Sequence, residues 1–91
     1  MAYLGQQKHD DIAHNIIRSV SKRIKEERER RGWTVMDLLV ESHVNQQTIY
    51  NLENMTERNP KMKTLVALAD AFGMDVWDFI RPEVMVEAER Q

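Results

Sequence analysis

The segment of residues 34–53, TVMDLLVESHVNQQTIYNLE, most limits the folds that this chain can adopt. Thr34, with Asp37 three residues later, forms a capping-box pattern that predicts the start of a short helix. Asn45 can cap a second helix, and only a tight turn around His43 separates the two. Two short helices joined in this way must cross and pack together, so the segment predicts a helix-turn-helix unit.

A longer helix is predicted before this unit. Asp10 or Asp11 can cap it, and Gly32 suits its C-terminal end. Its apolar residues recur at helical spacing: Ile12, Ala13, Ile16, Ile17, Val20 and Ile24. The charged run at residues 22–31 is interpreted mostly as a solvated helix face.

Two further helices are predicted after the unit. One follows Pro60, carries Met62, Leu65, Leu68, Ala69 and Phe72 on one stripe, and ends at Gly73. The other is capped by Asp75 and terminated by Pro82. The sequence therefore predicts an all-α, five-helix domain over residues 11–82, with a flexible arm at residues 1–10 and an acidic tail at residues 83–91.

Composition narrows the possible functions. The chain has 91 residues and no cysteine, which excludes metal sites with thiolate ligands. Its net charge is −2, so any binding to nucleic acid must depend on local geometry rather than on a strongly basic surface. Neither a signal peptide nor an apolar run of about 20 residues is present, which predicts a cytoplasmic protein with no membrane partner. His9, His14 and His43 are scattered, and the sequence predicts neither enzyme activity, nor a metal site, nor a cofactor.

Amide side chains gather at the start of the second short helix. A glutamine amide can donate to N7 of adenine and accept from its N6, so Gln46 and Gln47 are suited to reading adenine in a DNA major groove. The alternative is that these residues are ordinary surface amides.

From residue 20 to residue 80 the sequence resembles the Cro/C1-type (XRE) helix-turn-helix domain of phage repressors and bacterial regulators. The pieces that carry the resemblance are IKEERERRGW, TVMDLLVESHVNQQTIYNLEN and RNPKMKTLVALADAFGMDVWDFI, in that order. The stretch NQQTIYNLEN is especially similar to lambdoid phage repressors. The resemblance implies a lambda-repressor-like fold, here with an extended first helix, that binds double-stranded DNA.

The resemblance also implies roles for individual residues. The residues expected to read bases are Asn45, Gln46, Gln47, Tyr50 and Asn51. The residues expected to contact phosphates are Thr34, Asn54, Arg58, Asn59 and Lys61. Arg28 and Glu53 occupy the positions of an ion pair that holds the reading helix, and a homodimer is expected to form through Met62, Val76 and Trp77.

Three positions depart from the family's pattern. Val35 replaces a glutamine that reaches phosphate, Leu39 replaces a small residue where the two short helices cross, and His43 replaces the turn glycine. These changes leave the docking angle on DNA open.

Two functions follow from the resemblance. The first is a regulator, expected to act as a repressor, that binds a palindromic operator as a homodimer. The alternative is an antitoxin or another protein-interaction module, with a protein partner bound through the N-terminal extension of the first helix.

Overall fold

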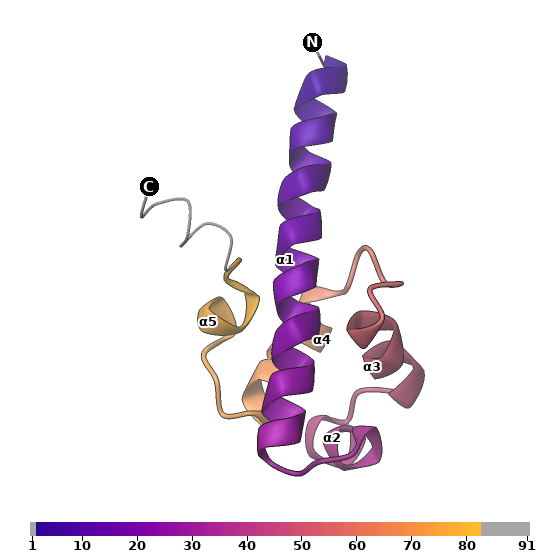
Figure 1. The fold of residues 1–91 in the computed structure, drawn as a ribbon, viewed down its shortest axis with the longest axis vertical. Coiled ribbons are helices and arrows are strands. Elements are labelled where there is room, and N and C mark those ends of the chain that lie inside the picture. The colour runs from indigo at the N-terminus through magenta and orange to yellow at the C-terminus, as the bar shows by residue number, and fades with distance from the viewer. Residues whose placement is uncertain (1, 83–91) are drawn as a thin grey trace.

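The longest element is α1 (Ala2–Arg30), a helix of 29 residues. It is seen in a computed structural model that describes residues 2–82, with side chains from Gln7 onward (Figure 1). The predicted start at Asp10 or Asp11 was wrong. No proline interrupts residues 2–10, and Gln7 Nε2 donates to Asp11 Oδ1 across one turn at 3.5 Å, so both aspartates lie inside the helix. The flexibility of residues 1–10 stays a prediction, and the predicted tail at residues 83–91 lies outside the described residues.

Four short helices follow α1: α2 (Val35–Ser42), α3 (Gln46–Glu53), α4 (Met62–Ala71) and α5 (Val76–Ile80). Gly32 and Gly73 adopt φ of +68° after the ends of α1 and α4, where glycine costs least. Asp75 caps α5, because its Oδ1 accepts from the backbone N of Trp77 at 2.8 Å. Residues 2–82 contain no strand, and the predicted all-α, five-helix fold is confirmed.

The core lies between the C-terminal half of α1 and the four short helices (Figure 1). Its buried members are Val20, Ile24, Val35, Leu38, Val44, Ile49, Leu52, Leu65, Leu68, Ala69, Phe72 and Phe79. The predicted apolar face of α1 joins this core only in part. Ile17 is buried and Ile16 packs against the core, but Ile12 is 47% exposed. The part of α1 that precedes Ile16 therefore extends beyond the packed domain.

Two arginines of the charged run, Arg23 in α1 and Arg31 directly after it, donate to other parts of the molecule, so the interpretation of this run as mostly a solvated face needs correction. Arg23 donates to the backbone O of Phe79 at 2.7 Å and ties α1 to α5. Arg31 donates to the backbone O of Phe72 at 2.6 Å and lies over the rings of Phe72 and Trp33, which are stacked. These contacts fix the ends of α4 and α5 against α1.

Among residues 2–82, no helix is both long enough and apolar enough to cross a membrane.

Candidate nucleic-acid interface

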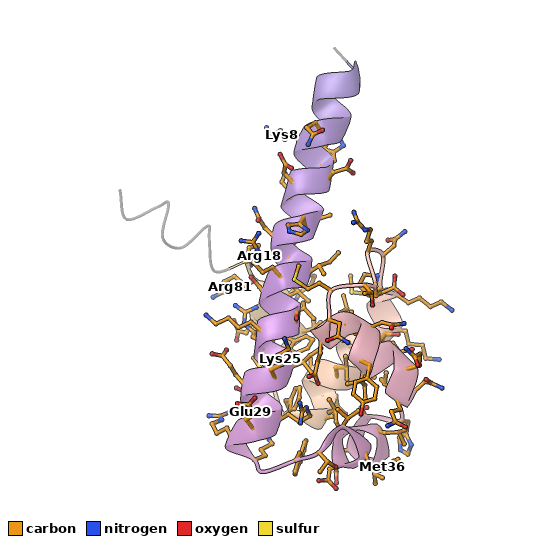
Figure 2. The ribbon with its side chains drawn as sticks, turned by 45° about the vertical axis from the view of Figure 1, so that its right-hand side comes forward. Lys8, Arg18, Lys25, Glu29, Met36 and Arg81 are labelled. Atoms are coloured by element: carbon orange, nitrogen blue, oxygen red, sulfur yellow. The ribbon has the colours of Figure 1, made fainter. Side chains whose placement is uncertain are left out.

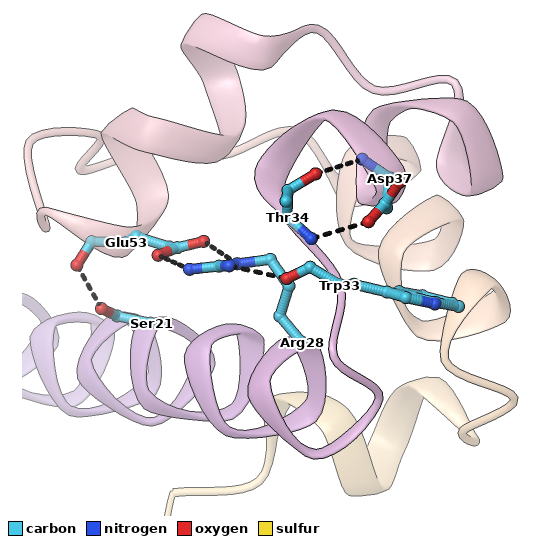
Figure 3. Close-up of polar contacts among 6 residues, drawn as sticks. All are labelled: Ser21, Arg28, Trp33, Thr34, Asp37 and Glu53. Carbon is cyan, nitrogen blue, oxygen red and sulfur yellow. Dashed lines mark hydrogen bonds and ion pairs between the residues drawn. The ribbon is translucent and has the colours of Figure 1, made fainter.

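The start of α2 is fixed by a capping box. The backbone N of Asp37 donates to Thr34 Oγ1 at 3.1 Å, and the backbone N of Thr34 donates to Asp37 Oδ2 at 2.8 Å (Figure 3). Two backbone donors that the helix itself cannot satisfy are thus paired. The hydroxyl hydrogen of Thr34 is left to donate outward, so the residue keeps one donor for a phosphate oxygen.

The turn between α2 and α3 is held by short side chains. The Ser42 hydroxyl donates to the backbone O of Leu38 at 2.7 Å and accepts from the backbone N of Val44 at 3.1 Å. His43 adopts the left-handed conformation with φ of 61°, as the turn requires. Asn45 Oδ1 accepts from the backbone N of Gln47 at 2.7 Å and caps α3. The angle between the two helices is therefore specified by local chemistry.

The C-terminal end of α3 is anchored to α1 by the pair at Arg28 and Glu53 (Figure 3). Arg28 Nε donates to Glu53 Oε2 at 2.9 Å, and Nη2 donates to Oε1 at 3.1 Å. Arg28 Nη1 also donates to the backbone O of Trp33 at 2.9 Å. Hydrogen bonding to Glu53 raises the pKa of Arg28, although burial of the guanidinium works the other way. One guanidinium thus joins α1, the end of α3 and the segment that leads into α2.

Ser21 completes this anchor, and sequence reasoning missed it. Its hydroxyl donates to the backbone O of Glu53 at 2.8 Å in a buried position. Ser21 precedes Arg28 by seven residues, which places both side chains on one face of α1. The spacing of seven residues from Arg28 is the feature of the sequence that could have identified Ser21 as a second residue of α1 that contacts Glu53.

The predicted base-reading residues lie along α3. Asn45, Gln47 and Tyr50 are exposed, and Gln46 and Asn51 are half-buried. Gln47 Nε2 donates to Asn51 Oδ1 at 3.0 Å, so two of these amides form a connected pair. The acceptor oxygen of Asn45 is used by the cap, so this side chain offers mainly its NH₂ group.

The predicted phosphate-contacting residues follow α3. Asn54, at the end of α3, and Arg58, Asn59 and Lys61 are all exposed. The loop folds back on α3, because the backbone N atoms of Thr56 and Glu57 both donate to the backbone O of Asn51. Thr56 was also missed by sequence reasoning. No spacing rule points to it, because its position depends on the path of the loop.

The three residues that depart from the family's pattern have different surroundings in the structure. Val35 is buried in the core, so this position offers no polar group to DNA. Leu39 is half-buried and packs against the core between α2 and its neighbours. His43 is exposed, and its backbone N donates to the backbone O of Leu39 at 2.7 Å. The first helical side chain of α2 is therefore part of the core, and the exposed polar residue at this end of α2 is its cap, Thr34.

The residues expected at a dimer contact differ in exposure. Met62 is 57% exposed and Trp77 is 66% exposed. Val76 is half-buried and packs against the core. Met62 therefore departs from the predicted core stripe of α4. Two of the three side chains, Met62 and Trp77, are therefore accessible to a second chain.

The described residues contain no group of three or more side chains suited to holding a metal ion.

A helix-turn-helix family model matches residues 24–76, which is more than half of the chain. The match begins in α1 and ends at the start of α5, so it contains α2, the turn and α3 whole. No curated protein matches the chain, and no solved structure matches it.

Proposed function

The chain belongs to the Cro/C1-type helix-turn-helix family of DNA-binding regulators, and we propose that it is a bacterial or phage repressor that binds a palindromic operator as a homodimer. In this proposal α3 enters the major groove and its amides contact base edges. The capped start of α2 and the loop after α3 would contact the phosphates on either side. Such a protein would act in the cytoplasm, where the DNA of these organisms lies.

One observation carries the proposal most directly. α3 carries the exposed Gln47 bonded to the half-buried Asn51, while Arg28 and Ser21 hold the end of the same helix at Glu53. A helix that reads bases needs an exposed polar face and a fixed orientation, because small displacements break bidentate contacts. The structure supplies both without a strongly basic surface, which fits a binder that depends on geometry.

The test is selection of binding sites from random duplex DNA with the full chain, followed by a salt titration on the selected site. A palindromic site is expected. The double substitution Gln46→Ala and Gln47→Ala should lower affinity for that site by roughly one to three orders of magnitude. Gln7→Ala is the matched control, because Gln7 is an exposed glutamine in the part of α1 that precedes the first residue packed against the core, Ile16. An unchanged affinity and preference in the double variant would refute base reading by these residues.

The homodimer has its own test. Exposed Trp77 is proposed as the centre of the contact, and exposed Met62 is proposed to take part in it. Trp77→Arg places a charge there and should shift the protein to monomer in sedimentation equilibrium. It should also reduce binding to the palindrome far more than binding to a single half-site. A dimer of undiminished stability would place the contact elsewhere.

The length of α1 favours a second candidate function, an antitoxin or another protein-interaction module. Residues 7–14 are all exposed, and α1 extends past the other helices at this end (Figures 1 and 2). Deleting residues 1–15 discriminates between the two functions. The deletion should spare operator binding if the protein is primarily a DNA-binding regulator, and should abolish partner binding if this segment holds a protein.

A further inference from the structure

We infer that residues 83–91, the acidic segment after α5, pack against the N-terminal extension of α1 and cover Ile12 and Ile16. The contact lies within one chain and is independent of DNA binding. It joins an apolar face of α1 to the stretch of chain that leaves α5 beside that face.

The α5-side face of α1 consists of Ile12, Ile16, Ser19 and Arg23, which share one side of the helix because they are spaced by four, three and four residues. Arg23 donates to the backbone O of Phe79 in α5, and Ser19 is only 4% exposed. Farther toward the N-terminus, where α1 continues past α5, Ile16 is half-buried and Ile12 is 47% exposed (Figure 1). Exposure therefore rises along this face with distance from the contact with α5, although the residues remain apolar.

The chain leaves α5 close to the α5-side face. Arg81 has an extended backbone, with φ of −63° and ψ of 125°, as expected for a residue before proline. Residue 83 follows Phe79 by four positions, so it can lie at most about 14 Å from the bond between Phe79 and Arg23. Ile12 lies about 17 Å from Arg23 along the helix axis, a distance that an extended chain covers in about five residues. Residues 83–91 therefore reach Ile16 and Ile12 without strain.

The composition of residues 83–91 matches this face. The segment reads EVMVEAERQ, with apolar residues at positions 84–86 and 88, and its three glutamates and one arginine give it a charge of −2. On α1, Lys8 lies one turn before Ile12, and Arg23 lies at the other end of the face (Figure 2). Asp10 and Asp11 are only two and one positions from Ile12, so they point away from it. Apolar residues flanked by glutamates are thus complementary to an apolar strip flanked by cations.

The contact has a consequence for the second candidate function. That function assigns the extension of α1 to a protein partner, so a partner that binds the α5-side face has to displace residues 83–91. Such a partner needs the chemistry of the segment that it replaces, which is a short apolar stretch with acidic residues on both sides. Residues 83–91 would then limit binding to partners that match this surface closely.

Introduced cysteines can test the contact, because the chain has none of its own. Ile12→Cys is combined in turn with Met85→Cys and with Ala88→Cys in the full chain. His14→Cys replaces Ile12→Cys in the matched controls, because His14 is exposed, lies two positions from Ile12 and faces another side of α1. A segment with no preferred site would reach both positions of α1 about equally.

Under mild oxidation at low protein concentration, an internal disulfide should form roughly tenfold faster with Ile12→Cys than with His14→Cys in at least one of the two pairs, because docking raises the local concentration of the segment. Equal rates at the two positions would overturn the inference. A covalent dimer formed in preference to the internal disulfide would also overturn it, because the segment would then cover a second copy of the chain.

Hydrogen exchange tests the same contact without cysteines. The double substitution Val84→Asp and Met85→Asp places charges in the apolar part of the segment, outside the core of the domain. Protection of the amides at residues 12–16 should fall roughly fivefold, whereas the amides at residues 20–24 should keep theirs. Gln91→Asp is the control, since it adds a charge beyond the apolar part and should change neither group. Unchanged protection at residues 12–16 in the double variant would contradict the contact.

Discussion

Arg28 donates two parallel hydrogen bonds to the carboxylate of Glu53, at 2.9 Å from Nε and 3.1 Å from Nη2. The side chain of Glu53 is only 8% exposed, so this carboxylate is poorly solvated and depends on its partner. The two residues lie 25 positions apart in the sequence. Together with the bond from Ser21 to the backbone O of Glu53, their pairing links α1 to the helix that is proposed to read DNA.

We expect Arg28→Met to destabilise the protein by about 2–4 kcal/mol, because it leaves a buried carboxylate without a partner. Urea unfolding measures the change. Arg30→Met is the matched control, since the Arg30 side chain is 68% exposed, and it should cost no more than about 0.5 kcal/mol. Adding Glu53→Met to Arg28→Met should recover much of the loss. Equal effects of the Arg28 and Arg30 substitutions would contradict this account.

The capping box at Thr34 makes a separate contribution. Thr34→Ala removes the oxygen that accepts from the backbone N of Asp37 and should cost about 1 kcal/mol of folding stability. Thr34→Ser keeps the oxygen and should be close to wild type. Both are measured by thermal unfolding without DNA, so that the proposed phosphate contact of Thr34 does not enter. A serine variant as unstable as the alanine variant would rule out the cap as the cause.

The ion pairs of Glu27 should make stability depend on pH. Burial acts to raise the pKa of Glu27, but hydrogen bonds from Arg31 and Arg30 outweigh it and hold that pKa below its usual range. The unfolded chain therefore binds the proton more readily, so the stabilisation is present above the unfolded pKa of about 4.3 and is lost as pH falls through the lower folded pKa.

Glu27→Gln tests this dependence. At about pH 6 the variant should be less stable than wild type by about 1 kcal/mol, and the difference should shrink toward about pH 3. Urea unfolding at a series of pH values gives the two curves. A difference that does not change with pH would show that the charge of Glu27 is not what stabilises the fold.

His43 adopts an unfavourable backbone conformation in the turn between α2 and α3. Its φ of 61° is unfavourable for residues with a Cβ, so His43→Gly should stabilise the protein by about 0.5–1 kcal/mol. His43→Ala is the control, because it removes the imidazole and keeps the Cβ, and it should gain nothing. Thermal unfolding ranks the three proteins. An alanine variant as stable as the glycine variant would assign the effect to the imidazole instead.

Phosphate contacts should appear in the salt dependence of DNA binding. Lys61→Ala should reduce the slope of log affinity against log salt by about 1, with little change in sequence preference. Arg58→Ala should act in the same way. Lys8, near the far end of α1, provides the control, and its substitution should leave the slope unchanged (Figure 2). A slope that Lys61→Ala does not alter would remove this residue from the interface.

Local signals predicted the helices well, because caps and stop residues act over a few positions. Thr34, Asn45, Asp75 and Gly73 lie where the sequence placed them as helix boundaries. The start of α1 was predicted wrongly, because the two aspartates that suit a cap are also tolerated inside a helix when nothing before them stops it.

The contacts between distant segments were harder to predict. Arg28 was found only through the family resemblance, and Arg23 and Arg31 looked like ordinary surface charges. The partners of Arg23 and Arg31 are backbone carbonyl groups of Phe79 and Phe72, in or directly after other helices. Every residue has such a carbonyl group, so the sequence does not indicate which one an arginine will bind. Thr56 is of the same kind, since its contact with Asn51 exists only once the loop has folded.

The length of α1 has a thermodynamic consequence. From residue 7 to residue 14 every side chain is exposed, whereas Val20 and Ile24 are almost completely buried. Opening the helix at its early turns breaks backbone hydrogen bonds and exposed side-chain contacts such as that of Gln7 with Asp11, but opening it at Ile24 requires the whole core to come apart. Protection of its amides against hydrogen exchange should therefore rise along one unbroken helix. α1 is one continuous helix, yet its first turns can unfold and refold locally while α3 stays packed against the C-terminal half of α1.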